Sequence, residues 1–445
     1  MTGEQILGLV MLFGMITVIF VGFPISFTLL FLGLVFAAIG LGAELTFNLA
    51  SLQMWGTMKD EVFPAVPLFI FMGFMTEQAG LMERLFAALR NVLAPVRGSL
   101  YLAVILTATI FAMATGIVGA AVTVLGIMAA PMMIKAGYDA RLSSGAIAAG
   151  GTLGILVPPS VMLVVMGPTM GVPVNLLYSA AFGPGLLLAS LYIVYTLGRS
   201  FINPKLGPPV PKEDRITDPV KLITEFVVGV LPLALLIGFT LGTILAGMAT
   251  PTEAAACGAS GATLLALLYG KLSFKVLKNA AVMTMMTAGV VIFLAVASNV
   301  FGAVFTKLGT AQVITQALAA IPLPDMGKLI VIMIAVFLLG WPFEWPAIVL
   351  VFMPIVLPVV ETLQLGMNKL DLLIWFGALI AVNLQTAFLS PPVAMSAYYL
   401  RNVVPQWSLG LIYRGMGDFM IIQVICLVIV LLFPDIVLWL PRSLR

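Results

Sequence analysis

The sequence predicts an all-α polytopic membrane protein built from two inverted-topology repeats, and three observations lead to that fold class. Hydrophobic residues make up 62% of the 445-residue chain and charged residues only 9%. A soluble protein of this length could not carry that balance on its surface. Uncharged runs longer than the roughly 18 residues of a membrane helix recur in both halves. An adjacent proline pair interrupts one such run in each half, at Pro158-Pro159 and at Pro391-Pro392.

The uncharged runs define candidate membrane spans, and the basic residues between them set the orientation. The long uncharged runs are 5–43, 98–134, 142–200, 226–252, 279–306 and 372–400. Lysine and arginine concentrate at 84–97, 135–141, 199–221, 271–278 and 401–414, which the positive-inside rule places in the cytoplasm. The segment 42–61 is mostly acidic at its charged positions, so we expect it and the N-terminus on the periplasmic side.

A proline-rich linker divides the chain into halves of similar length. Residues 203–218 carry four prolines with mixed charge. We take 1–202 as the first repeat, 203–221 as a cytoplasmic linker and 222–445 as the second repeat. Each repeat is expected to hold three spans, a re-entrant hairpin, a helix broken at its proline pair and a last span. Because that makes about five crossings, an odd number, the second repeat enters the membrane inverted, as the basic clusters also require.

Each repeat ends with a hairpin, a broken helix and a last span. In the first repeat these are expected at about 98–134, 142–167 and 175–199. In the second they are expected at about 329–360, 372–400 and 417–440. The first hairpin has basic residues on both flanks and is shorter than the roughly 40 residues plus a turn that two crossings need, so it should open to the cytoplasm. The second carries its charges at its outer ends and at Glu344, so it should open to the periplasm.

The two proline pairs predict a binding site. Proline removes a backbone donor and clashes with the preceding turn, so carbonyls just before each pair lose their helical partners. Such groups are tolerated at membrane depth only where they are buried in protein or line a cavity. Paired interruptions in the two halves of a membrane protein therefore indicate where a ligand binds.

Oxygen atoms near the breaks and the hairpin tips suit a hard monovalent cation such as Na⁺, with one site in each half. The first site is predicted from Thr115, Gly116, Gly119, Thr152, Gly154, Pro158 and Ser160. The second is predicted from Gly340, Glu344, Asn383, Gln385, Thr386, Ser390 and Pro391. The candidate substrate contacts are Thr115, Ser160, Thr386 and Ser390. The alternative is that these small residues only allow helices to pack closely.

Two acidic residues need separate interpretations. Glu344 lies near membrane depth, where a carboxylate is costly and is a candidate ion ligand, proton carrier or partner of an incoming cation. It could instead lie in water at the hairpin mouth, between Trp341 and Trp345 as an interfacial aromatic pair. Glu253 follows Thr250-Pro251-Thr252, so we expect it to cap a helix start.

Several functional classes are excluded or disfavoured by what the chain contains. It has no histidine, so imidazole metal sites and Ser-His or Cys-His nucleophiles are ruled out, and we predict neither a catalytic residue nor a transition metal. Cys257 and Cys426 lie in apolar segments and are expected to be small core residues. No phosphate-binding loop is present, and the net charge of +3 sits in short clusters, so neither ATP drive nor nucleic-acid binding is expected.

Five motifs resemble those of one transporter family. They are GTLGILVPPS at 151–160, ATPTEAAACGA at 249–259, MPIVLPVV at 353–360, NLQTAFLSPPVAM at 383–395 and LFPDIVLWLP at 432–441. In this order they resemble the large transmembrane subunit (M subunit) of tripartite ATP-independent periplasmic (TRAP) transporters. The resemblance implies an elevator-type ion transporter fold in a bacterial inner membrane. It also implies a sodium-coupled importer of organic acids that works with a small four-helix membrane subunit and a periplasmic substrate-binding protein, without another cofactor.

Three segments differ from the family pattern, and two other functions remain open. The first tip reads ATGIVGAA where serine is usual, the second tip reads WPFEWP where aspartate has small neighbours, and the second break has Ser-Pro-Pro for Thr-Pro-Pro. One alternative function is a carboxylate or anion transporter of related fold that needs no binding protein. The other is a non-transporting membrane assembly or scaffold protein.

Overall fold

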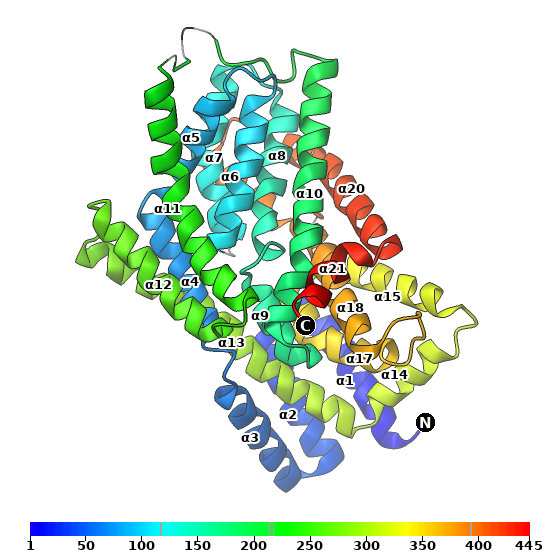
Figure 1. The fold of residues 1–445 in the computed structure, drawn as a ribbon. Coiled ribbons are helices and arrows are strands. Elements are labelled where there is room, and N and C mark those ends of the chain that lie inside the picture. The colour runs from blue at the N-terminus through cyan, green and yellow to red at the C-terminus, as the bar shows by residue number, and fades with distance from the viewer. Residues whose placement is uncertain (116–117, 212, 214, 217, 392–393) are drawn as a thin grey trace.

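The structure is a computed structural model that describes residues 1–115, 118–211, 213, 215–216, 218–391 and 394–445. Every regular element in those ranges is helical (Figure 1). Among the described residues, seven helices are long and apolar enough to cross a membrane, or up to eight if a bent pair of helices counts as one span. The predicted all-α polytopic class is therefore confirmed.

The described residues of the first half form ten α-helices. They are α1 (Gly3–Phe20), α2 (Ile25–Leu41), α3 (Ala43–Lys59), α4 (Ala65–Gln78), α5 (Leu81–Leu93), α6 (Ser99–Thr115), α7 (Val118–Lys135), α8 (Ala140–Thr152), α9 (Val161–Met170) and α10 (Val174–Ile202). Helices α4 and α5 form the bent pair, with an angle of 61° between them. The segment 42–61, which we expected on the periplasmic side, is mostly helix α3. This helix exposes large apolar side chains such as Phe47 and Trp55.

The second half repeats the order of elements seen in the first half, with a hairpin followed by an interrupted helix. Its helices are α11 (Pro219–Leu245), α12 (Pro251–Leu268), α13 (Phe274–Lys307), α14 (Thr310–Ala319), α15 (Asp325–Leu339), α16 (Trp345–Ala347), α17 (Met353–Val360), α18 (Lys369–Leu384), α19 (Met395–Val403), α20 (Leu409–Leu432) and α21 (Asp435–Ser443). A π-helical turn, Ile348–Phe352, joins α16 to α17. Figure 1 shows the upper ends of α10 and α11 at one end of the molecule and helix α3 at the opposite end.

The two halves interleave instead of forming separate domains. Helix α8 of the first half packs closely on α20 of the second, because Gly145 and Gly415 face each other. A Cβ built on Gly145 would lie 2.6 Å from the carbonyl oxygen of Gly415. Helix α7 packs on α19 in the same way, since a Cβ on Gly126 would lie 2.7 Å from a methyl of Val403. Small residues at these crossings let the backbones approach.

Two local predictions outside the site can be compared with the structure. Glu253 forms a reciprocal capping box with Thr250 at the start of α12, which confirms its interpretation as a helix cap. Cys426 is buried, as expected for a core residue, but Cys257 is exposed on α12, so that part of the expectation was wrong. An exposed Cys257 is consistent with a surface in contact with lipid or with another membrane helix.

Candidate functional site

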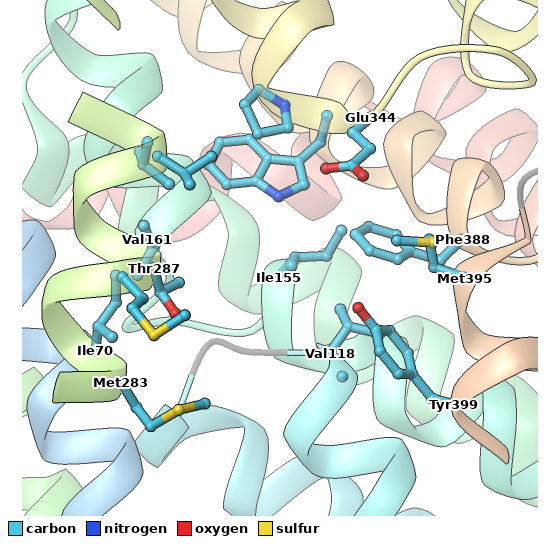
Figure 2. A pocket seen from close by; sticks show the side chains of 16 residues that line it. Ile70, Val118, Ile155, Val161, Met283, Thr287, Glu344, Phe388, Met395 and Tyr399 are labelled. Atoms are coloured by element: carbon cyan, nitrogen blue, oxygen red, sulfur yellow. The ribbon is translucent and has the colours of Figure 1, made fainter. Parts of the chain in front are cut away.

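A central cavity of about 410 Å³ lies where both hairpin tips and both helix breaks meet (Figure 2). The irregular segments contribute Val118 and Gly119 at the first tip, Ile155 and Val161 around the first break, Glu344, Trp345 and Pro346 at the second tip, and Phe388 and Met395 around the second break. The sequence predicted one site per half from these segments. The structure brings all four segments to the wall of one common space.

The opposite wall comes from two helices that carry no predicted site residue. Helix α4 contributes Ile70, and α13 contributes Met283, Met286, Thr287, Val290 and Val291. The spacing of the five α13 residues places them on one face of that helix. Because this face is almost entirely apolar, the sequence alone could not distinguish it from a surface in contact with lipid.

The first break keeps its hydroxyl groups bonded to its own backbone. Thr152 Oγ1 donates to the carbonyl oxygen of Ala149 at 2.8 Å, and Ser160 Oγ donates to that of Ile155 at 2.6 Å. Both side chains are fully buried, and Gly154 is buried in the short 3-10 turn between them. These residues therefore shape the backbone behind the cavity wall and are absent from its lining.

A buried glutamine from the other half contacts the first break. Gln423 of α20 places Nε2 3.5 Å from Thr152 Oγ1. Its Oε1 atom and the hydroxyl of Tyr192 have no partner among the described residues. Sequence reasoning missed Gln423, although an amide inside a long apolar helix is a signal that could have identified it.

The second break packs directly on the second hairpin. A Cβ on Gly340 would lie 3.2 Å from Cβ of Ala387, and Asn383 Nδ2 donates to the carbonyl oxygen of Met333 in α15 at 2.8 Å. Thr386 donates its hydroxyl proton to the carbonyl of Asn383, and Ser390 donates to that of Thr386, both at 2.7 Å. The hairpin and the broken helix of the second half are therefore in direct contact, which is the arrangement that the sequence predicted.

Two amides at the second break carry atoms without partners. In the described part of the chain, Asn383 Oδ1 and both amide atoms of Gln385 are buried and form no hydrogen bond. A buried polar group left unpaired costs about 1–3 kcal/mol. These amides therefore need a ligand, an ion or water. Pro391, predicted beside them, is exposed.

Glu344 lines the cavity and is the N-cap residue of α16. Its side chain is exposed and does not bond to the start of that helix. Trp345 also lines the cavity, whereas Trp341 does not. Of the two tryptophans in the interfacial alternative, Trp345 thus shares the cavity wall with Glu344. Figure 2 shows the Glu344 carboxylate on the same side of the cavity as Phe388, Met395 and Tyr399.

The first tip is only partly described. Thr115 is the last residue of α6, and Gly116 lies outside the described residues. Gly119 lines the cavity, and a Cβ there would lie 3.0 Å from the ring of Tyr399. Tyr399 was not predicted, although it follows Met395 by one helical turn and shares its face of α19.

The candidate substrate contacts differ from the residues that reach the cavity. Ser160, Thr386 and Ser390 are all buried behind its wall. Among the described residues, the predicted site residues that do line it are Gly119 and Glu344. Hydroxyl groups were expected to face the ligand, but in these helices they bond to carbonyls of the preceding turn instead.

The helix ends around the cavity have a consistent polarity. Helices α7, α9 and α19 begin at the cavity, since their first residues Val118, Val161 and Met395 line it. Helices α8 and α18 end at the two breaks. Helix N-termini carry partial positive charge and C-termini partial negative charge. None of the described residues lining the cavity is a lysine or an arginine.

Comparison with known proteins places the chain among membrane permeases. The family model described as "Tripartite ATP-independent periplasmic transporter, DctM component" matches residues 12–436. The sialic acid TRAP transporter large permease protein SiaM of Vibrio cholerae is 28% identical over 435 residues, which are 97% of each chain. The C4-dicarboxylate TRAP transporter large permease protein DctM of Pseudomonas aeruginosa is 28% identical over 422 residues, 92% of this chain and 94% of that protein.

A solved structure supports the fold independently of close sequence similarity. The YdaH transporter of Alcanivorax borkumensis superimposes with a TM-score of 0.61 at 15% identity, over 88% of this chain and 89% of that one. At this identity the likeness shows the fold alone. The cavity among hairpins and broken helices, the transporter fold and a family match across almost the whole sequence agree: the chain belongs to the DctM family of large permease components of tripartite ATP-independent periplasmic transporters.

Proposed function

We propose that the protein is the substrate-translocating subunit of a sodium-coupled importer of organic acids. Its place would be the bacterial inner membrane, with the N-terminus in the periplasm. The observation that carries the proposal is the central cavity, where helix N-termini meet without a cationic side chain in the described lining, beside a helix break that buries unpaired amide oxygens.

The proposal of an organic acid rests on the polarity of the helix ends. The N-terminal turns of α7, α9 and α19 offer partial positive charge and free backbone N–H groups to a carboxylate. Ser160 is the N-cap residue of α9 and its hydroxyl does not cap that helix, which leaves those N–H groups for a ligand. Two relatives are named as transporters of sialic acid and of C4-dicarboxylates, which are organic acids.

The proposal of sodium coupling rests on oxygen atoms near the helix C-termini. At the second break, Asn383 Oδ1 and Gln385 Oε1 are buried without partners in the described part of the chain, and α18 ends beside them. At the first break, α8 ends at Thr152, and the backbone around Gly154, Pro158 and Ser160 is irregular. Neutral oxygens in such a setting suit a hard cation that needs no histidine or thiolate.

The proposed mechanism is an elevator movement, and the proposed partners are two further subunits. The hairpins and broken helices would move together against α4 and α13, because α7 packs on α19 across the two halves. The partners would be a small four-helix membrane subunit and a periplasmic substrate-binding protein. The word "tripartite" in the family description supports three components, and exposed apolar side chains such as Phe13, Phe47 and Trp55 leave surface for a membrane partner.

Uptake into proteoliposomes tests this function. With its partner subunits and the cognate binding protein, the reconstituted protein should accumulate an organic acid only under an inward Na⁺ gradient. Asn383→Ala should lower the apparent Na⁺ affinity, whereas Ser260→Ala, on the exposed face of α12, should leave it unchanged. Uptake that persists after the Na⁺ gradient is collapsed would contradict sodium coupling. An intact complex that takes up no solute would favour the assembly-protein alternative.

A further inference from the structure

One side of the central cavity combines a carboxylate with three aromatic rings. Glu344, Trp345, Phe388 and Tyr399 all line the cavity. Figure 2 shows Glu344, Phe388 and Tyr399 on one side, across the space from Val161 and Thr287. Across the described residues, none of the ring pairs includes Trp345, Phe388 or Tyr399. Each of the three rings is only partly buried, so part of its surface remains available to a ligand in the cavity.

The Glu344 carboxylate also lacks a cationic partner. None of the ion pairs among the described residues involves Glu344. The described lining of the cavity contains no lysine or arginine that could neutralise it. A purely anionic substrate would thus meet a like charge on this side of the cavity, which costs free energy. The favourable ligand for this side is a cation.

We propose that the cavity takes a zwitterionic organic acid whose alkylated ammonium group lies against Glu344 and the rings of Trp345, Phe388 and Tyr399. The inference rests on the proposed function, because it assigns the substrate carboxylate to the free N-terminal turn of α9 on the Val161 side. Aromatic rings beside a carboxylate attract a quaternary or tertiary ammonium through cation–π and Coulomb interactions.

Alkylation of the nitrogen follows from the shortage of hydrogen-bond acceptors. Apart from Glu344 and Tyr399, this side offers apolar surface and the thioether of Met395. A primary ammonium would leave N–H groups unpaired, at a desolvation cost that methyl groups avoid. The volume of about 410 Å³ is also within the range of pockets for small organic ligands.

A matched set of three ligands tests the substrate class directly. The full chain in lipid nanodiscs, with Na⁺ present, is titrated by calorimetry with trimethylglycine, 3,3-dimethylbutanoate and succinate. The first two have the same shape and differ only in a quaternary nitrogen in place of a carbon. We expect trimethylglycine to bind at least about tenfold more tightly than 3,3-dimethylbutanoate, and succinate to bind most weakly. Equal affinity for the first pair, a preference for succinate, or no binding of any probe would each overturn the inference.

Substitutions assign the preference to named side chains. Glu344→Gln should weaken trimethylglycine binding at least about tenfold while changing 3,3-dimethylbutanoate binding by less than about twofold. Phe388→Leu should weaken trimethylglycine alone by a smaller factor. Glu361→Gln is the control, because Glu361 pairs with Lys369 at 3.0 Å and is absent from the cavity lining. A Glu344→Gln protein that retains the preference would overturn the assignment.

Failure of this inference can be distinguished from failure of the proposed function. Na⁺-driven uptake by the complete transporter measures whether the chain transports an organic acid at all. If uptake is sodium-dependent but trimethylglycine shows no advantage over its carbon isostere, only the zwitterion assignment is wrong.

Discussion

At the scale of single residues, Gln385 has surroundings that call for a ligand. Its side chain is fully buried at the second break, and neither amide atom has a partner in the described part of the chain. Nearby Ser390, by contrast, donates its hydroxyl proton to the carbonyl of Thr386 at 2.7 Å. The fold thus supplies a hydrogen-bond partner for the Ser390 side chain and none for the Gln385 side chain among the described residues.

Replacing Gln385 with leucine should have opposite effects without and with sodium. In Na⁺-free solution Gln385→Leu should match or exceed the wild-type melting temperature, because it removes about 1–3 kcal/mol of unpaired amide burial. The stabilisation produced by Na⁺ should fall by about 1.4 kcal/mol or more, equivalent to tenfold weaker binding. Thermal unfolding across a Na⁺ titration measures both effects.

The control for this measurement is Gln316→Leu on the exposed face of α14. It should leave the response to Na⁺ unchanged. A Gln385→Leu protein that melts well below wild type without Na⁺ would show that the amide has an unrecognised structural partner. An unchanged response to Na⁺ would remove Gln385 from the ion site.

The same residues show how much of the site the sequence could predict. The proline pairs and the charged tip at Glu344 identified the segments that meet at the cavity, because broken helices at membrane depth need a reason to exist. The direction of each side chain was not predictable. Ser160 donates its hydroxyl proton to the carbonyl of Ile155. Tyr399 reaches the cavity because of the rotation of α19 about its axis, and the packing of α19 against α7 determines that rotation.

At the scale of elements, close contact between α8 and α20 holds the first broken helix in place. A Cβ on Gly415 would lie 3.0 Å from the backbone nitrogen of Gly145 and would also clash with the carbonyl oxygen of Arg141. Gly417 lies on the same helix, but a Cβ there would meet no atom within 4 Å. One helix thus supplies a tightly packed glycine and an unpacked one.

Alanine substitutions at these two glycines should have opposite signs. Gly415→Ala should destabilise the protein by about 1–3 kcal/mol, the usual cost of inserting a methyl group into a close-packed contact. Gly417→Ala should stabilise it by about 0.5–1 kcal/mol through helix propensity. Chemical or thermal unfolding in the same detergent compares them. Equal effects would mean that the α8–α20 contact is looser than the structure shows.

The helical architecture was more predictable than its termini and accessory helices. Apolar runs and the proline pairs predicted the hairpins and interrupted helices, since such segments must satisfy their own hydrogen bonds. Helix α3 was not predicted, because its sequence mixes polar residues such as Glu44 and Asn48 with the apolar ones expected of a span. Its exposed apolar side chains identify it only after the helix is placed.

At the scale of the whole molecule, the proposed elevator movement divides the cavity wall into a moving and a fixed part. The moving part contains α7 and α19, which contact each other at Gly126 and Val403. The fixed part contains α13 and α4. Cross-links within one part and between the two parts should therefore differ in their effect on transport.

Paired cysteines in a background without Cys257 and Cys426 test this division. A Gly126→Cys/Val403→Cys disulfide is within reach, because the methyl of Val403 lies 2.7 Å from a Cβ on Gly126 and disulfides need Cβ atoms about 4 Å apart. It should leave most of the uptake intact. A thiol cross-linker between Met286→Cys on α13 and Trp345→Cys at the second tip should stop uptake, with recovery after a reducible linker is cleaved.

Two results would contradict the proposed movement. Arrest by the Gly126–Val403 disulfide would mean that α7 and α19 must separate during transport. Continued uptake with the Met286–Trp345 link in place would mean that the second tip does not move relative to α13. Each single-cysteine protein treated with the same reagents is the control for chemical modification alone.

Helix α13 has 34 residues and is about 51 Å long at 1.5 Å per residue, well beyond the roughly 30 Å of a hydrocarbon core. The face that it turns to the cavity carries two flexible methionines, two valines and a single threonine. A surface of this kind has almost no hydrogen bonds to break, and thioether chains adapt their shape at little cost. A neighbouring tip that moved along this face would therefore pass through many positions of similar free energy. No single position would be strongly favoured. In this protein, ligands at the opposite wall, more than α13 itself, would decide where the tip comes to rest.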